Sequence, residues 1–368
     1  MKDLNYSLPF YETAPLAEKK PCRKILLIVN PVSGRMKTKT GLFEILDELY
    51  RSAPDVATVG KNAPKTAGVA SPLPFPFGNL TNTTIGTDFV PDRRVTVMPT
   101  MHRGHASQMA SLAEQEGYDT VICCGGDGTL NETISGLLTI PADRRPTLGY
   151  IPAGSTNDFA ASIGLSASLR GAARTAVGDC ETSLDIGLFR PIGGESHPAR
   201  YFSYIASFGA FTAASYSTSQ TAKNLFGHVA YLLEGVKDLA NLIPRRASFD
   251  LADHTHREGE YVFGAITNTT SAGGVFKLPA DRVSMSDGLF ELFLVHHPKS
   301  AADLNKIATA LLSQDFDNCP LIELHHTTSV KVTLEENLSW SLDGEEAVGG
   351  TTIEVSCLPG AVTIKVNE

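Results

Sequence analysis

The chain has 368 residues, of which 42% are hydrophobic and 19% are charged, and its formal net charge at pH 7 is −9. These fractions exclude a largely disordered chain, a collagen-like repeat and a coiled coil as a global description. Because an acidic chain repels the phosphate backbone, we expect no nucleic-acid partner. At about 100 to 200 residues per domain, the length predicts two domains.

Nothing in the sequence indicates secretion or a membrane span. The longest apolar stretches, such as Ile25 to Val29, are far shorter than the ~20 residues needed to cross a bilayer. The N-terminus lacks the apolar core of a secretory signal. The six cysteines have no C-x-x-C spacing, which is typical of reduced thiols and not of a disulfide framework or a zinc site. The sequence therefore predicts a cytoplasmic protein.

The first half of the chain alternates predicted strands with predicted helices. Short apolar runs rich in Val and Ile predict buried strands, and apolar residues spaced three or four apart predict helices. This alternation predicts a parallel sheet covered on both faces, hence an α/β domain over residues 22–178. Residues 52–92 have no amphipathic period, so we expect a long surface insertion there. The predicted strands are 24–30, 94–100, 119–124 and 148–151, and the predicted helices are 40–50, 104–116, 130–138 and a stretch after 158.

The second half has a different pattern. From about residue 179, short β-rich runs are separated by turn residues, as in an antiparallel β-sandwich. We assign this domain to residues 179–359. Two helical segments interrupt it, at 224–243 and at 301–313.

The motif Gly125-Gly126-Asp127-Gly128-Thr129 follows a predicted strand and opens a predicted helix. Glycines let the backbone turn tightly, and a helix N-terminus offers N–H groups and a positive dipole end to a phosphate. A carboxylate such as Asp127 repels phosphates unless a cation bridges them or the carboxylate takes a proton from an attacking hydroxyl. Either role indicates Mg²⁺-assisted phosphoryl transfer from a nucleotide. The alternative interpretation is a tight glycine turn without a ligand.

Two further loops should meet this motif. Asn30-Pro31-Val32-Ser33-Gly34 follows the first strand, and the segment from Pro152 to Asp158 follows the fourth. Parallel strands end at one edge of the sheet, where ligands bind in such folds. Either loop alone reads as an ordinary turn, whereas three at one edge favour a nucleotide site. No G-x-x-x-x-G-K-[ST] and no G-x-G-x-x-G occurs, which argues against P-loop NTPases and dinucleotide dehydrogenases.

With these motifs the sequence resembles the diacylglycerol kinase catalytic-domain family, and within it the soluble bacterial lipid kinases. The likeness is carried, in order, by NPVSG, GGDGTLNE, PAGSTNDFA, SDGLFEL and LDGEE. It implies a nucleotide-binding α/β domain similar to those of NAD kinase and phosphofructokinase, then a β-sandwich that binds lipid, with a cleft between them. It also implies that the last strand, about 360–368, returns to the first domain.

The resemblance implies a set of site residues. Glu345 would be the general base, and Asp127 is the second candidate catalytic carboxylate. The implied cofactors are ATP and Mg²⁺, with the ion held by the side chain of Asp287 and the backbone carbonyls of Ser284 and Leu289. The residues expected to line the nucleotide are Asn30, Pro31, Ser33, Gly34, Thr100, Gly125, Gly126, Asp127, Gly128, Thr129, Asn131 and Ser155.

Taken alone, Asp343-Gly344 predicts a hairpin turn. Such a turn can also present Glu345 to a cleft, where its carboxylate would accept the proton of a lipid hydroxyl that attacks the γ-phosphate. We further hypothesise that the 224–243 helix, with Phe208 and Phe211, lines a groove for an acyl chain.

The sequence therefore predicts an ATP- and Mg²⁺-dependent kinase for diacylglycerol or a related lipid, which visits the membrane surface transiently. One alternative is a soluble-acceptor kinase similar to NAD kinase, against which the late D-G-E and the PAGSTND motif argue. The other is a nucleotide- and lipid-binding regulatory protein without turnover, against which Asp127 and Glu345 argue. The sequence leaves open which lipid is the acceptor and whether the protein forms a homodimer.

Overall fold

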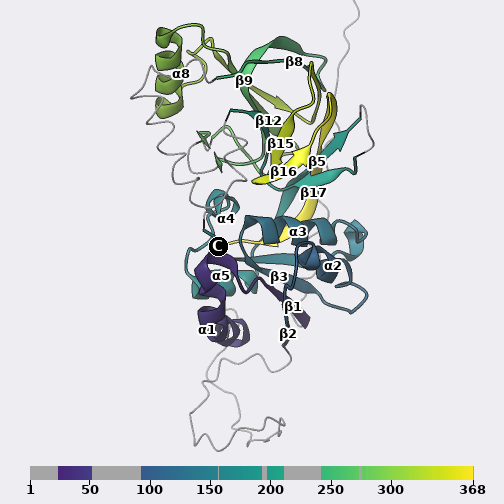
Figure 1. Ribbon diagram of the computed structural model, residues 1–368. Helices are drawn as coiled ribbons and strands as arrows, with labels where there is room; N and C mark the ends of the chain where they lie inside the picture. Colours follow the sequence, from purple (N-terminus) through teal and green to yellow (C-terminus); the bar gives the residue numbers. More distant parts are fainter. Residues whose placement is uncertain are drawn as a thin grey trace, which may run out of the picture.

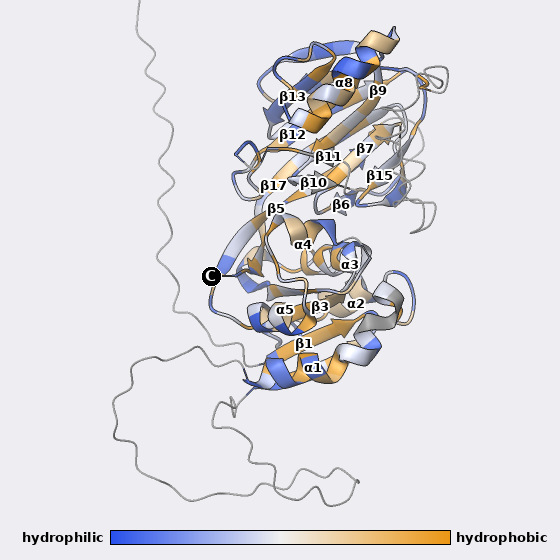
Figure 2. Ribbon diagram, turned by 90° about the vertical axis from the view of Figure 1, so that its left-hand side faces the viewer, coloured by the Kyte–Doolittle hydropathy of each residue, from blue (hydrophilic) through white to orange (hydrophobic). Residues whose placement is uncertain are grey.

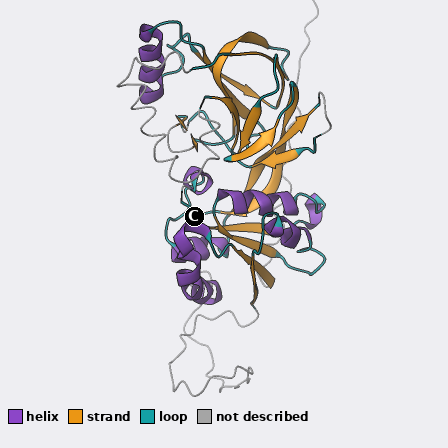
Figure 3. Ribbon diagram, viewed as in Figure 1, coloured by secondary structure: helices purple, strands orange, loops and turns teal. Residues whose placement is uncertain are grey.

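The computed structural model describes residues 24–51, 93–155, 157–192, 197–210, 242–272, 276–279 and 281–367. The predicted 52–92 insertion and nearly all of the predicted 224–243 helix lie outside the described residues. Figure 1 shows two parts, and Figure 3 shows that helices gather in one part while strands dominate the other. None of the helices in the described ranges is long and apolar enough to span a membrane.

The α/β part contains four parallel strands in the order β4-β3-β1-β2. The strands are β1 (Lys24–Val29), β2 (Arg94–Pro99), β3 (Thr120–Gly125) and β4 (Thr147–Pro152). The helices are η1 (Ser33–Met36), α1 (Lys37–Arg51), α2 (His105–Ser111), α3 (Asp127–Leu137), η2 (Ala142–Arg144), α4 (Asp158–Ser162) and α5 (Leu169–Ala176).

Helices cover both faces of this sheet. Ile25 and Leu27 of β1 pack in one cluster with residues of α1 and α5, whereas Leu26 and Ile28 pack with residues of α2 and α3. A strand buried on both faces needs apolar residues at every position, which is why β1 is a continuous apolar run. Figure 2 shows this hydrophobic character along β1 and β3.

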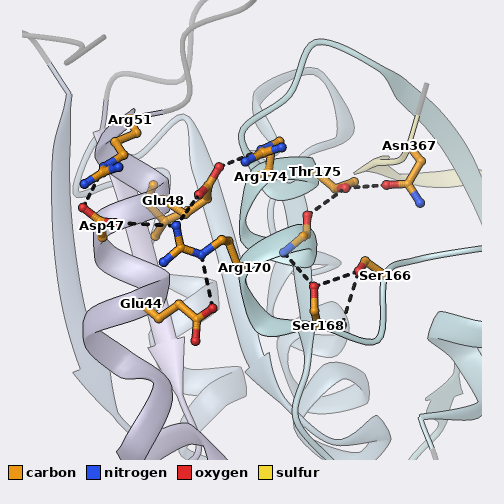
Figure 4. A network of polar contacts seen from close by, with 12 residues as sticks. Glu44, Asp47, Glu48, Arg51, Ser166, Ser168, Arg170, Arg174, Thr175 and Asn367 are labelled. Atoms are coloured by element: carbon orange, nitrogen blue, oxygen red, sulfur yellow. Dashed lines mark hydrogen bonds and ion pairs between the residues drawn. The ribbon is translucent and has the colours of Figure 1, made fainter. Parts of the chain in front are cut away.

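Ion pairs join α1 to α5, as Figure 4 shows. The side chain of Glu48 is only 5% exposed, and it pairs with Arg174 at 2.7 Å and with Arg170 at 3.8 Å. At the far end of α5, Thr175 Oγ1 donates a hydrogen bond to Asn367 Oδ1. The end of the chain is therefore attached to the α/β part.

The second part is an antiparallel β-sandwich, so the predicted fold class is confirmed. Its strands are β5 (Glu181–Pro191), β6 (Arg200–Phe202), β7 (Ile205–Gly209), β8 (Arg245–Leu251), β9 (His256–Thr267), β10 (Ser271–Ala272), β11 (Phe276–Lys277), β12 (Phe290–His296), β13 (Ile322–Thr327), β14 (Ser329–Leu334), β15 (Ser339–Leu342), β16 (Glu345–Val348) and β17 (Thr352–Lys365). Helix α8 (Ala301–Ser313) has the predicted bounds.

Phe208 lies in the core of this sandwich and not beside a groove. Its side chain is 0% exposed, and its ring centroid lies 4.9 Å from that of Trp340 and 6.3 Å from that of Phe249. The expectation that Phe208 contacts an acyl chain was therefore wrong, because β7 turns this ring into the sheet interior. Phe211 lies outside the described residues.

Strand β17 connects the two parts (Figure 1). It pairs antiparallel with β5 and β14 and parallel with β4 through Ile364 and Leu148. The register shifts between Leu358 and Val362. The segments before and after this shift look like two separate strands in the sequence, but they form one bent strand. The segment at about 360–368 thus reaches the first sheet. The domain boundaries at 178 and 359 stay predictions, since β5 and β17 extend across both parts.

Glu291 on β12 is an unpaired buried carboxyl group. Its side chain is 0% exposed, and neither carboxylate oxygen has a hydrogen-bond partner within the described ranges. Burial raises the pKa of Glu291 from 4.5 to about 8, so this group is protonated in the folded protein at pH 7.

Glu291→Gln is expected to weaken the pH dependence of stability. Because the folded pKa lies above the unfolded value, Glu291 contributes stability that is fully present below pH 4.5 and lost as the pH rises through 8. Thermal unfolding at pH 5.5 and pH 8 should show a smaller difference for Glu291→Gln than for wild type. Glu335→Gln, at a carboxyl group that is 67% exposed, is the control. Equal differences for Glu291→Gln and wild type would contradict this assignment.

Candidate active site

Three loops meet at the carboxyl edge of the parallel sheet. Asn30 N donates to Cys124 O at 2.9 Å, and Ala153 N donates to Gly125 O at 2.8 Å, so the strand ends are bonded in register. The loops follow β1, β3 and β4, at residues 30–34, 125–129 and 152–155. The predicted convergence is present.

Glycines let these loops touch. A Cβ atom on Gly34 would lie 1.9 Å from the carbonyl oxygen of Ala153, and a Cβ on Gly154 would lie 2.6 Å from Cα of Gly126. Any side chain at these positions would push one loop away from its neighbour. The loop after β4 is therefore packed against both of the others.

Gly34→Ala is expected to lower the free energy of unfolding by about 2–4 kcal/mol, because left-handed backbone strain adds to the overlap with Ala153. Gly34 has φ +53°. The matched control is Gly104→Ala, where φ is +82° but no heavy atom of the described chain lies within 4 Å of the added Cβ. Urea unfolding should show a loss of only about 1 kcal/mol for the control. Equal losses of unfolding free energy in the two variants would mean that the close contact of Gly34 with Ala153 does not contribute to stability.

Helix α3 starts at the centre of this arrangement. Gly126 occupies its N-cap in an extended conformation, with φ −93° and ψ −178°, and no side chain among the described residues caps it there. Asn30 Nδ2 donates to Thr129 Oγ1 at 2.9 Å, and Asn30 Oδ1 accepts from Val32 N at 3.1 Å. An uncapped helix N-terminus behind a glycine turn suits a phosphate group.

A cleft of about 480 Å³ opens at this edge. Its volume falls within the roughly 300–1,000 Å³ typical of small-molecule sites. The predicted site residues in its lining are Asn30, Pro31, Ser33, Thr100, Gly126, Gly128, Thr129 and Glu345. Its other lining residues are Val32, Met101, His102, Arg103 and Glu132.

The remaining predicted nucleotide-site residues lie outside this lining. Gly125 is packed against Thr129, whose Cβ would lie 2.7 Å from a Cβ on Gly125. Gly34 is enclosed by the loop after β4, and Ser155 is exposed on that loop. Asn131 turns toward the β-sandwich, as its hydrogen bonds to that domain show.

Glu345 reaches the cleft from the β-sandwich. It directly follows the turn between β15 and β16, and its side chain is 35% exposed. Its Oε1 lies 3.4 Å from the position of a Cβ on Gly128. Its Oε2 accepts hydrogen bonds from Arg103 Nη2 at 2.6 Å and from Arg200 Nη2 at 3.3 Å. A carboxylate from one domain thus meets the glycine loop of the other.

Asp343 holds the turn that presents Glu345. It is 5% exposed, has φ +50°, and accepts from the backbone N of Tyr204 and of Ile205, each at 3.0 Å. Its Oδ2 accepts from Ser203 N at 2.6 Å, from Ser203 Oγ at 2.7 Å and from Asn131 Nδ2 at 2.7 Å. Burial raises the pKa of Asp343, and these donors oppose the rise. The hairpin turn predicted from Asp343-Gly344 is present, and Asn131 ties it to α3.

Asp127 belongs to the glycine loop but is not part of the cleft lining. Its Oδ2 accepts from Asp158 N at 3.3 Å, whereas Oδ1 is buried without a hydrogen-bond partner among the described residues. Burial, followed by the charges of Asp158 and Asp343, raises the pKa of Asp127 from 3.8 to about 7. The unpartnered oxygen of Asp127 is of the type that Mg²⁺ prefers as a ligand. Among the described residues, no three or more Asp, Glu, His or Cys side chains are grouped so that they could hold a metal ion.

A separate turn before β12 carries the residues predicted to hold Mg²⁺: Ser284, Asp287 and Leu289. Asp287 is exposed, and its Oδ1 accepts from Leu289 N at 3.0 Å. The buried Asp185 of β5 accepts from Gly288 N at 2.6 Å and from Gly360 N at 2.7 Å. Asp185 thus fastens this turn to β17. The sequence analysis did not predict this role of Asp185, although an acidic residue inside the apolar run SLDIGLF is a signal of a buried hydrogen-bond acceptor.

The loop after β2 also forms part of the site, and only Thr100 of it was predicted. Residues 101–103 line the cleft. Glu132 of α3 accepts from Gly104 N at 2.7 Å and from Ala106 N at 3.3 Å, which holds this loop against α3. Because β2 is a fourth parallel strand, its end lies at the same edge as the other three. The position of residues 101–103 after a predicted strand was therefore the signal in the sequence that could have placed them in the site.

Two family models match this chain. The model described as diacylglycerol kinase catalytic domain matches residues 87–189, and the one described as YegS C-terminal NAD kinase beta sandwich-like domain matches residues 205–366. The diacylglycerol kinase of Bacillus subtilis (strain 168) is 31% identical over 324 residues, which cover 88% of this chain and 90% of that protein. The chain belongs to the diacylglycerol kinase family. The predicted family is thus confirmed.

Further members of the diacylglycerol kinase family are similar to this chain. The diacylglycerol kinase of Staphylococcus haemolyticus (strain JCSC1435) is 30% identical over 249 residues, or 67% of this chain and 71% of that protein. A crystal structure of a diacylglycerol kinase from Bacillus anthracis str. Sterne has a TM-score of 0.61 and covers 94% of this chain and 97% of that chain. Its sequence identity is 20%, so this likeness supports the fold alone.

Proposed function

We propose that this protein is an ATP-dependent lipid kinase that transfers the γ-phosphoryl group of ATP to a hydroxyl group of diacylglycerol or a related lipid. Membership of the diacylglycerol kinase family and the names of its relatives support this function. The observation that carries it is Glu345, a carboxylate from the β-sandwich at a cleft lined by the glycine loop. Proton removal from an acceptor hydroxyl calls for such a group, whereas nucleotide binding alone does not.

The three glycine-rich loops would bind the nucleotide. The N-terminus of α3 suits the phosphates, with Gly126, Gly128 and Thr129 in the cleft wall. Ser33 and Thr100 add hydroxyl groups from the loops after β1 and β2. Because Gly126 and Gly128 carry no side chains, their backbone N–H groups would be able to contact a phosphate directly.

In the proposed reaction, the hydroxyl oxygen of the lipid attacks the γ-phosphorus while the carboxylate of Glu345 accepts the hydroxyl proton. The bridging oxygen leaves with ADP. Bound Mg²⁺ would neutralise charge that develops on the phosphate oxygens. Asp127, with its orphaned oxygen, is the residue we propose to hold that ion near the loop, and the Asp287 turn is proposed as a structural cation site. A diacylglycerol acceptor resides in a bilayer, so the proposal includes transient contact with a membrane surface.

The test is an acceptor panel. Purified protein is incubated with Mg-ATP and, separately, diacylglycerol, sphingosine, ceramide, undecaprenol or NAD, and the phosphorylated product is identified. We expect phosphorylated diacylglycerol, and no product when Mg²⁺ is chelated. Phosphorylated NAD would instead support a soluble-acceptor kinase. Tight nucleotide binding without any product would support a regulatory protein.

A further inference from the structure

Arg103 and Glu345 form an ion pair across the cleft. Arg103 belongs to the loop after β2 in the α/β part, and Glu345 belongs to the hairpin of the β-sandwich. Arg103 Nη2 lies 2.6 Å from Glu345 Oε2, although the two residues are 242 positions apart in the chain. Both side chains line the cleft. The pair therefore stands where the proposed base would receive the acceptor hydroxyl.

The two arginines on Glu345 are held differently. Arg200 also donates to Oε2, at 3.3 Å, but its Nη1 donates to the backbone carbonyl of Glu346 at 2.7 Å. This second bond anchors Arg200 to the hairpin. Arg103 is 74% exposed, and Glu345 is its one ion-pair partner in the described part of the chain. Arg103 can therefore leave Glu345 without breaking any other ion pair there.

The pair competes with the proposed reaction for Oε2 of Glu345. Oε2 of Glu345 already accepts hydrogen bonds from two guanidinium groups, so an acceptor hydroxyl that approaches this oxygen must displace one of them. Oε1 lies 3.4 Å from the position of a Cβ on Gly128. Of the two donors at Oε2, Arg103 is the less anchored and hence the one that such a hydroxyl would displace.

The terminal phosphate of ATP is a stronger partner for that guanidinium. An exposed ion pair with one carboxylate is weak, because water and salt screen it. A phosphate carries more charge and accepts two parallel hydrogen bonds from an arginine. For transfer to occur, the terminal phosphate must lie next to the acceptor hydroxyl and hence near Glu345. That position is within reach of Arg103.

We propose that Arg103 exchanges partners when ATP binds: its guanidinium leaves Glu345 for the terminal phosphate, and the freed carboxylate receives the acceptor hydroxyl. This exchange rests on the proposed function. It makes Arg103 a residue that senses the third phosphate of the nucleotide and releases the base only when that phosphate is present.

The test compares dissociation constants for Mg-ATP and Mg-ADP, measured by calorimetry on the full chain. Arg103→Ala is expected to weaken ATP binding about tenfold and ADP binding less than twofold, since ADP lacks the terminal phosphate. Arg103→Lys keeps the positive charge but lacks the two parallel N–H donors of the guanidinium group. Its dissociation constant for ATP should lie between those of wild type and Arg103→Ala. The matched control is Arg144→Ala: Arg144 is 56% exposed and pairs with Glu114 at 3.1 Å, outside the cleft lining. It should leave both constants unchanged.

Each result is decisive. Unchanged binding of both nucleotides in Arg103→Ala would mean that Arg103 stays on Glu345, and equal weakening of both would place it away from the terminal phosphate. Either result overturns the exchange while leaving the proposed kinase activity intact. Wild-type protein that binds neither nucleotide would overturn the proposed function and the exchange together. Arg103 is largely exposed, so Arg103→Ala should fold, and a thermal melt checks this.

Discussion

Glu345→Gln is expected to lower kcat by about a thousandfold, the middle of the range of roughly a hundred- to ten-thousandfold for losing a general base. The amide keeps the size of the side chain and an oxygen for Arg103, but it cannot accept the acceptor's proton. The dissociation constant for ATP should stay within about threefold of wild type, because the glycine loop is untouched. Steady-state kinetics with diacylglycerol and nucleotide binding by calorimetry measure the two quantities.

The neighbouring carboxylate provides the control for this experiment. Glu346 is exposed on the same hairpin and its Oε1 accepts from Ser339 Oγ at 2.9 Å, outside the cleft lining. Glu346→Gln should leave kcat within about twofold, as is usual for an exposed side chain that touches no substrate. Undiminished turnover in Glu345→Gln would refute its role as base and leave Asp127 as the next carboxylate to test.

Asp343→Ala is expected to lower the free energy of unfolding by about 3–5 kcal/mol and to abolish activity. Its carboxylate accepts five hydrogen bonds, from three backbone N–H groups, one hydroxyl and the amide of Asn131. Without the carboxylate, these buried donors lose their partner and the hairpin that carries Glu345 loses its anchor to α3. Urea unfolding and the kinase assay measure the two effects.

A turn aspartate elsewhere in the sandwich tests the reason given for Asp343. Asp253 is exposed and accepts from Thr255 N and Thr255 Oγ1, each at 2.9 Å. Asp253→Ala should destabilise the protein far less, because water can satisfy those donors once the carboxylate is gone. If both variants lost a similar amount of unfolding free energy, burial of the hydrogen bonds to Asp343 would not explain the effect of Asp343→Ala.

Local sequence patterns were sufficient to predict most of the strands and helices. The strand β1 was predicted because a strand covered on both faces must be apolar at every position. Helix α8 was predicted with its observed bounds, and in the structure Ser300 caps its N-terminus by accepting from Asp303 N at 3.1 Å. Strand β13 (Ile322–Thr327) is a weak signal in the sequence, because only Ile322 and Leu324 alternate with its polar residues. It forms through pairing with β12, and Glu323 is bonded to His325 at 2.9 Å.

The glycine loop and its neighbours could also be expected from sequence, because motif residues adjacent in the chain decide the local turn. The α2 helix shows the limit of such patterns. Helical spacing continued to residue 116, but α2 ends at Ser111 and the chain then runs through turns to Gly117, which has φ +72°. Gly117 makes the left-handed turn that returns the chain to β3.

The order of strands and helices, the phosphate-type loop after β3 and the family were determined by the sequence itself, since backbone conformation and apolar periodicity depend on residues close together in the chain. Only the tertiary structure decided that Asp343 anchors the hairpin, that Asp185 fastens the Asp287 turn and that Arg103 meets Glu345. Partners in these contacts are 138 or more, 103 or more, and 242 positions apart, respectively. No local pattern encodes which distant donor will meet a buried acceptor, because that choice follows from how β17 and the hairpin bring the two domains together.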